Sequence, residues 1–236
     1  MSTDDKLFDR LNMAKRADLL ALLGDLKLDS DEYRKYENDR LIDIVSRELR
    51  SAAGNSIANT MRGPHDLPYK QILIDVADKL CPGRFSQTEF KLSDLNTSED
   101  IESYIYDRIG EIWKKYLDSL NASDRAKLQL QFEKDLRERG LPSQIATGTA
   151  STLMTGVLGG ALVAPLVATA VFGSLWTMLF GVTTAQMIAG GLLGGGPIGL
   201  IIAGVAVASG PSYRKTIPCV VRLIFIKLSY EAEKNL

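Results

Sequence analysis

The stretch that decides the fold runs from Thr149 to Trp176, TASTLMTGVLGGALVAPLVATAVFGSLW, and it contains no charged residue. It lies within a longer segment, Gly140 to Tyr213, in which 74 consecutive residues lack Asp, Glu, Lys, Arg and His. A helix needs about 20 apolar residues to cross the hydrocarbon core of a bilayer, so this segment has room for two crossings. We expect a Gly-rich transmembrane hairpin, with crossings over residues 149–176 and about 182–208.

The charges of the chain lie on both sides of this uncharged segment. Residues 1–139 hold 23 basic and 27 acidic residues, a net charge of −4, and residues 214–236 hold 5 and 2, a net charge of +3. Neither part has the basic balance of a nucleic-acid-binding domain. We therefore expect a soluble head (1–139), an uncharged membrane hairpin (140–213) and a basic amphipathic C-terminal helix (214–236).

The head is predicted to be all-α, because apolar residues recur at helical spacing and no run of alternating β-branched residues interrupts them. A short helix is expected around the leucines of residues 19–26. Longer helices are expected over residues 31–53 behind an Asp29 cap, 66–80, 97–117 behind a Thr97 cap, and about 122–139. The last of these helices is expected to lead straight into the uncharged segment.

Small residues in the uncharged segment are spaced one helical turn apart. Gly156 with Gly160, and Gly190 with Gly194, are the candidates for close helix packing in the membrane. Small residues are also common in membrane helices that do not pair specifically, so both interpretations stay open. The GGGP run at residues 194–197 is expected to break the second helix, which could make that span re-entrant.

Basic residues flank the uncharged segment on both sides, from Arg137 and Arg139 before it to Arg214 and Lys215 after it. Because Lys and Arg favour the cytoplasmic side of membrane proteins, we expect the hairpin in a bacterial inner membrane, with the head and both termini in the cytoplasm. Two alternatives are open. The hairpin could lie hidden in a helical shell and enter the membrane only on a trigger, as in pore-forming toxins, or the segment could form a wholly soluble core.

The C-terminal residues 217–228 place Arg222 and Lys227 among apolar side chains. This pattern suits a helix that lies at the membrane interface or is docked on the head. The two basic side chains are expected to reach toward lipid headgroups.

No arrangement of residues indicates catalysis or metal binding. His65, the single histidine, has no Cys or second His near it in the sequence. Residues 194–199 match G-x-G-x-x-G in form, but they follow no predicted strand and no acidic residue stands about 20 positions later. We therefore expect no enzyme activity, no cofactor and no nucleic-acid partner.

Two stretches carry a resemblance to a known family: residues 54–63 (GNSIANTMRG) continued by 69–80 (YKQILIDVADKL), and residues 212–218 (SYRKTIP). They resemble the motifs of the YaaW-type family of uncharacterised bacterial proteins, in the same order along most of the chain. That family is remotely grouped with ubiquinol-cytochrome c chaperones, all-α proteins that help to assemble a respiratory membrane complex. The resemblance implies a structural or partner motif made of Ser56, Asn59, Arg62, Gly63, Tyr69, Asp75, Tyr213, Arg214, Thr216 and Pro218.

Arg62 and Asp75 are predicted to lie on neighbouring helices, where an ion pair would clamp them together; a contact with a partner or a lipid headgroup is the alternative. Taken together, the sequence favours a membrane-associated interaction, assembly or chaperone-like factor without chemistry of its own. Its expected partners are membrane lipids and either another protein or a second copy of itself. The alternative is a pore-forming effector whose hairpin is released on a trigger.

Overall fold

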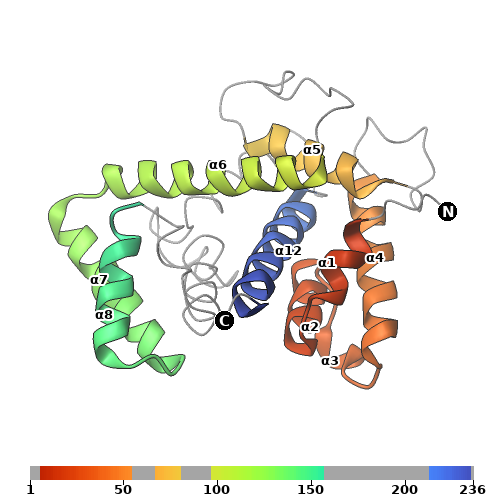
Figure 1. The fold of residues 1–236 in the computed structure, drawn as a ribbon, viewed down its shortest axis with the longest axis horizontal. Coiled ribbons are helices and arrows are strands. Elements are labelled where there is room, and N and C mark those ends of the chain that lie inside the picture. The colour runs from red at the N-terminus through yellow and green to blue at the C-terminus, as the bar shows by residue number, and fades with distance from the viewer. Residues whose placement is uncertain (1–5, 55–66, 81–96, 157–212, 235–236) are drawn as a thin grey trace. The chain divides into compact units, whose positions relative to one another are not determined.

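The computed structural model describes residues 6–54, 67–80, 97–156 and 213–234 (Figure 1). The regular elements in these ranges are α1 (Lys6–Asn12), α2 (Arg16–Asp25), α3 (Ser30–Tyr33), α4 (Asn38–Gly54), α5 (Tyr69–Leu80), α6 (Ser98–Ser119), α7 (Ala122–Glu138), α8 (Ser143–Leu153) and α12 (Tyr213–Lys234). All of them are helices, which confirms the all-α prediction for this part of the chain. Among the helices described here, none combines the length and the apolar character that a membrane crossing requires.

The chain divides into two compact units. Unit 1 comprises Met1–Tyr106 and Ile202–Lys227, and unit 2 comprises Asp107–Ile201 and Leu228–Leu236. Unit 1 therefore contains chain from both sides of the uncharged segment. Most of the hairpin expected over residues 140–213, with Gly160, Gly190 and Gly194, lies outside the described residues.

The prediction of one helix over residues 31–53 is wrong. Asp29 is the expected cap, and its carboxylate accepts the Asp31 N–H at 3.0 Å, but the helix that it starts is the short α3. Residues 34–37 separate α3 from α4. The guanidinium of Arg16, from α2, donates to two main-chain carbonyl oxygens of this turn and so holds it in a non-helical conformation. The spacing of apolar residues could not predict this break, because Arg16 lies on a different helix.

Three other predicted helices are confirmed: α5 covers most of residues 66–80, α6 corresponds to 97–117, and α7 to 122–139. The start of α6 is a capping box. The Thr97 hydroxyl accepts the Asp100 N–H at 3.2 Å, and the Asp100 carboxylate accepts the Thr97 N–H at 2.8 Å. These bonds are local, which is why the sequence pattern predicted them.

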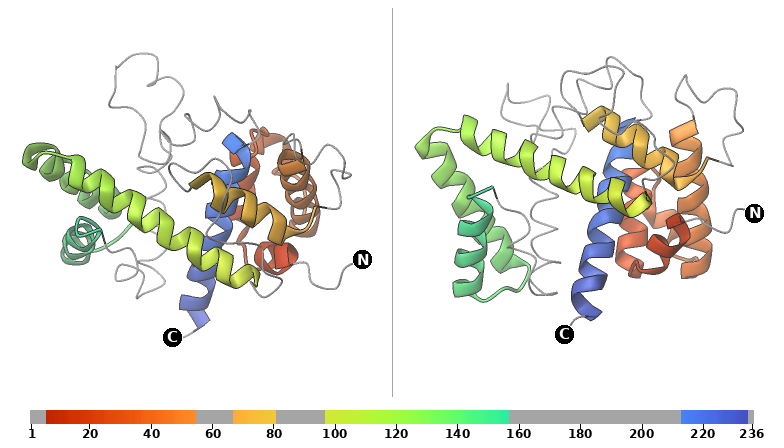
Figure 2. Two further views of the ribbon diagram at one scale, coloured as in Figure 1. Left: turned by 90° about the horizontal axis from the view of Figure 1, so that it is seen from above. Right: turned by 45° about the horizontal axis from the view of Figure 1, so that its top comes forward.

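The central helix of unit 1 is α12, in which every residue from Thr216 to Ile226 is buried. A helix that is buried on all sides must be surrounded by other elements, and in both views of Figure 2 α12 lies among the helices of unit 1. Its contacts are Cys219 and Arg222 with α2, Tyr213 with α5, and Phe225 and Lys227 with α6. The sequence allowed two positions for this helix, at the membrane interface or docked on the head, and the structure shows it docked.

In unit 2, α7 does not lead straight onward as predicted. The Leu141 N–H donates to the Leu136 carbonyl at 3.1 Å and the Gly140 N–H to the Arg137 carbonyl at 2.9 Å. Gly140 has a φ of 91°, which a residue with a Cβ rarely adopts. This glycine-based ending reverses the chain, and α8 packs back against α7.

The first crossing expected over residues 149–176 is not one continuous helix. α8 ends at Leu153, whose carbonyl accepts the buried indole N–H of Trp113 at 2.9 Å. Gly156 follows in a turn with a φ of 83°, and a Cβ added there would lie 3.0 Å from the Cβ of Lys114. The end of α8 is thus fixed against α6, and the later part of the expected crossing lies outside the described residues.

Candidate functional site

A buried cluster of polar side chains surrounds Glu102 in unit 1. Glu102 lies in the first turns of α6 and is 1% exposed. Its carboxylate accepts bonds from Arg10 Nε at 2.9 Å, Arg10 Nη2 at 3.0 Å, the Tyr69 hydroxyl at 3.1 Å and Lys227 Nζ at 3.0 Å. A carboxylate offers about four acceptor positions, so the capacity of Glu102 is filled.

Each donor to Glu102 comes from a different helix. Arg10 belongs to α1, Tyr69 to α5 and Lys227 to α12, and the figures show these helices meeting near the start of α6 (Figures 1 and 2). Glu99, about one turn earlier on α6, accepts a further bond from Arg10 Nη2 at 3.0 Å. The cluster therefore joins four helices of unit 1, including the one that follows the uncharged segment.

The surroundings of Arg10 and Tyr69 hold each side chain in its ordinary protonation state. Burial lowers the pKa of Arg10, but the hydrogen bonds and negative charge of Glu102 outweigh burial and raise that pKa above its ordinary value. Burial raises the pKa of Tyr69 well above its ordinary value, and the charge of Glu102 raises it further. At neutral pH Arg10 is a cation and Tyr69 a neutral donor, so neither is suited to exchange protons as a general acid or base.

A second buried ion pair joins α12 to α2. Arg222 Nε donates to Asp25 Oδ2 at 2.5 Å, and the two side chains are 11% and 12% exposed. Burial raises the pKa of Asp25, and the charge of Arg222 offsets part of that rise. Arg222 and Lys227 are thus both paired inside unit 1, so the expectation that they reach toward lipid headgroups is wrong.

Among the predicted motif residues that the structure describes, Tyr69 alone belongs to the cluster around Glu102. The other described motif residues are Asp75, which accepts a bond from Gln71 at 2.9 Å; Tyr213, whose ring centroid is 5.1 Å from Lys79 Nζ; Arg214, which is exposed; and Thr216 and Pro218, which are buried in α12. Ser56, Asn59, Arg62 and Gly63 lie outside the described residues. The predicted Arg62–Asp75 pair and His65 therefore lie outside them too.

Arg10 and Glu102 were not predicted from the sequence as site residues. Glu102 stands three residues before Ile105 and seven before Ile109, which places it on the apolar face of α6. A carboxylate within an apolar stripe is the signal that could have found it. Arg10 stands three residues after Leu7 and next to Leu11, so the same signal places it on the buried face of α1. Neither signal identifies the partner, which is 92 residues away in the sequence.

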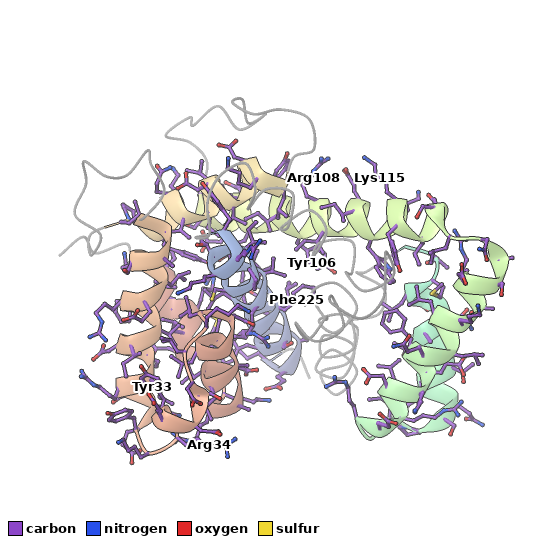
Figure 3. All side chains as sticks on the ribbon, turned by 180° about the vertical axis from the view of Figure 1, so that it is seen from behind. Tyr33, Arg34, Tyr106, Arg108, Lys115 and Phe225 are labelled. Carbon is purple, nitrogen blue, oxygen red and sulfur yellow. The ribbon has the colours of Figure 1, made fainter. Side chains whose placement is uncertain are left out.

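The described residues give weaker indications of a ligand site elsewhere. An open hollow of about 590 Å³ at the α3–α4 turn has Arg16, Arg34, Lys35, Glu37 and Asp39 in its lining, and this mixture of charges selects no ligand. Figure 3 shows Arg34 at this end of unit 1. Within the described ranges, no three potential metal ligands of the His, Cys, Asp or Glu type gather together.

Comparison with known proteins finds relatives among named bacterial proteins. A UPF0174 protein of Helicobacter pylori strain J99 is 28% identical over 206 residues, which cover 84% of this chain and 76% of the relative. The UPF0174 protein YaaW of Escherichia coli K12 is 26% identical over 189 residues, covering 78% and 70%. A UPF0174 protein of Helicobacter pylori strain 26695 is 25% identical over 216 residues, covering 86% and 97%.

These relatives support the predicted YaaW-type family, and the similarity extends along most of the chain. No family model and no solved structure matches.

Proposed function

We propose that this chain is a membrane-associated interaction factor of the assembly or chaperone-like type, acting without chemistry of its own. The uncharged segment, residues 140–213, is the membrane anchor in this proposal, and the helical units contact a protein partner or a second copy. The remote grouping of YaaW-type proteins with ubiquinol-cytochrome c chaperones supports an assembly role. The 74 uncharged residues support the membrane location.

The observation that carries the proposal is the pairing of α12 with helices that precede the uncharged segment. Arg222 bonds Asp25 across 197 residues of sequence, and Lys227 bonds Glu102 across 125. Such contacts within one unit require both flanks of the segment to lie in the same aqueous compartment. Two crossings meet this requirement and one does not. The basic flanks favour the cytoplasmic side.

A pore-forming effector is the second candidate. Its specific support is α8, which belongs to the uncharged segment yet packs within unit 2, with Ala146, Ala150 and Leu153 fully buried. A segment that is partly held by protein is suited to release on a trigger. An assembly factor should leave the membrane potential of an expressing cell unchanged, whereas a pore former should depolarise the cell.

Alkaline carbonate extraction tests the proposal. We expect the intact chain to stay in the membrane pellet, and a variant in which a flexible polar linker replaces residues 157–212 to become soluble. The linker variant keeps α8 and α12, so it retains every helix described here for the two units. Recovery of the intact chain in the carbonate supernatant would contradict constitutive anchoring and leave the triggered alternative.

A further inference from the structure

Two lysines of α6 lie beside Gly156, the residue from which the chain enters residues 157–212. Gly156 has a φ of 83°, and a Cβ added there would lie 3.0 Å from the Cβ and the Cγ of Lys114. The side chain of Lys114 therefore lies directly against the main chain of this turn. Lys115 follows it on α6, and both lysines are exposed (Figure 3). We call Lys114, Lys115 and Gly156 the first stem.

Cations also lie where the chain returns to unit 1. Tyr213 is the first described residue after residues 157–212, and Lys79 Nζ of α5 lies 5.1 Å from the centroid of its ring. Figures 1 and 2 show the end of α5 close to the start of α12. In the first turn of α12, Arg214 is exposed and Lys215 is half-buried. We call Lys79, Tyr213, Arg214 and Lys215 the second stem.

Four cations of the stems lack a counter-charge in the described part of the chain. No residue described there forms an ion pair with Lys114, Lys115, Arg214 or Lys215. The acidic neighbours on α6 are already paired, Glu111 with Arg108 at 2.5 Å and Asp118 with Arg125 at 3.4 Å. The first turn of α12 contains no acidic residue. Both stems therefore present positive charge that these residues do not compensate.

Helix stability does not account for the cations of the second stem. The N-terminal end of a helix carries a partial positive charge, which favours acidic side chains there and disfavours cations. α12 begins with Arg214 and Lys215 instead, and its first acidic residue is Glu231. An anion from outside the chain would compensate the two side chains and the helix end together.

The position of the stems in the chain indicates where that anion comes from. Both stems border residues 157–212, which contain no charged residue and belong to the membrane anchor of the function proposed above. Side chains that adjoin an anchor where it leaves the bilayer lie at the level of the lipid headgroups. Lys and Arg bind phosphate groups through charge-assisted hydrogen bonds. The ligand with the matching charge at this level is the phosphate of an anionic phospholipid.

We propose that the two stems bind the phosphate groups of anionic phospholipids and so fix where the anchor enters and leaves the bilayer. This inference rests on the proposed membrane function. The residues that it names differ from Arg222 and Lys227, which are paired within unit 1. Each Lys or Arg near an anionic membrane surface strengthens association by about five-fold, so a pair of them should produce a measurable preference between lipids.

Spin-labelled lipids test the inference with the full-length chain reconstituted in phosphatidylcholine bilayers. Electron spin resonance distinguishes lipids that the protein holds from lipids that move freely. It compares phosphatidylglycerol with phosphatidylcholine carrying the same label on the acyl chain. At low salt, we expect the parent to hold phosphatidylglycerol at least about three-fold more strongly. Replacing Lys114 and Lys115 by Gln, or Arg214 and Lys215 by Gln, should reduce that preference by about half, and high salt should reduce the preference of the parent.

Two control variants distinguish charge in the stems from charge elsewhere and from a structural effect. Arg34→Gln with Lys134→Gln removes two cations that have acidic partners and are 70% and 78% exposed, so the preference should not change. Lys114→Arg with Lys115→Arg keeps both charges of the first stem and should keep the preference of the parent.

The inference is overturned if the parent holds both lipids equally, or if neither stem pair lowers the preference. It is also overturned if the Arg34 and Lys134 control lowers the preference as much as the stem pairs do, or if the arginine variant loses it. In all these cases the membrane anchor stands, because the chain still holds lipid. If the chain holds neither lipid, the proposed anchor is contradicted and the inference fails with it.

Discussion

Replacing Glu102 by Gln should destabilise unit 1 strongly, because it removes the charge of a carboxylate that is 1% exposed and accepts from three donor side chains. The amide keeps one oxygen acceptor but turns an N–H₂ group toward donors of Arg10 and Lys227. Leaving a buried cation without its counter-charge costs about 3–5 kcal/mol. For a chain of this size, that corresponds to a fall in the melting temperature of roughly 6–20 °C.

The matched control is Glu99→Gln, on the same helix. The Glu99 side chain is 42% exposed and accepts a single bond from Arg10, so its loss should cost no more than about 1 kcal/mol. Thermal unfolding followed by circular dichroism compares the two variants with the parent. Lys227→Met should recover part of the stability lost in Glu102→Gln, because it removes one stranded charge. If Glu102→Gln melts like Glu99→Gln, the cluster does not hold the four helices together and this reasoning is refuted.

Three further results are expected. Residues 1–139 alone should bind a hydrophobic dye and unfold without a cooperative transition, because they lack α12, and adding a peptide of residues 213–234 should restore the transition; a cooperative melt of the fragment alone would show that α12 is dispensable. Gly156→Ala should lower the melting temperature, because of the φ of 83° and the 3.0 Å approach to Lys114, whereas Gly148→Ala, with open space around it, should raise it slightly; equal shifts would contradict the described turn. Burial raises the pKa of Glu99, but bonds from its main chain and from Arg10 outweigh burial and lower that pKa. The stability that Glu99 contributes should thus be present above about pH 4.5 and disappear as the pH falls through its folded pKa, so parent and Glu99→Gln should melt alike in acid and differ at neutral pH.

Local signals in the sequence were sufficient for part of the fold. The Thr97–Asp100 capping box and the apolar stripe behind it predict α6 almost to the residue, because every interaction that defines its start lies within one turn. The break after α3 was not predictable in this way, since Arg16 creates it from another helix. Gly140 was visible in the sequence, but whether a glycine ends a helix or continues it depends on the α8 contacts that follow.

The candidate site was less predictable than the fold. Arg222 and Lys227 stood out as charges within an apolar helix, and a lipid surface and a protein interior both explain that pattern. Only the positions of Asp25 and Glu102, 197 and 125 residues away, decide between the two. The sequence therefore identified which side chains needed partners, but not which partners they had.

The bond between the Trp113 indole and the Leu153 carbonyl gives the protein an optical reporter of its own. The chain has two tryptophans, so a Trp176→Phe variant emits from Trp113 alone. While α8 stays on α6, the buried indole should fluoresce at short wavelength and resist quenching by iodide. If a trigger pulls the start of the uncharged segment away, the emission should shift to the red and become quenchable in water, or stay blue and become quenchable by brominated lipids in a bilayer. The emission maximum and its quenching together would thus show when this segment changes its surroundings, and what the new surroundings are.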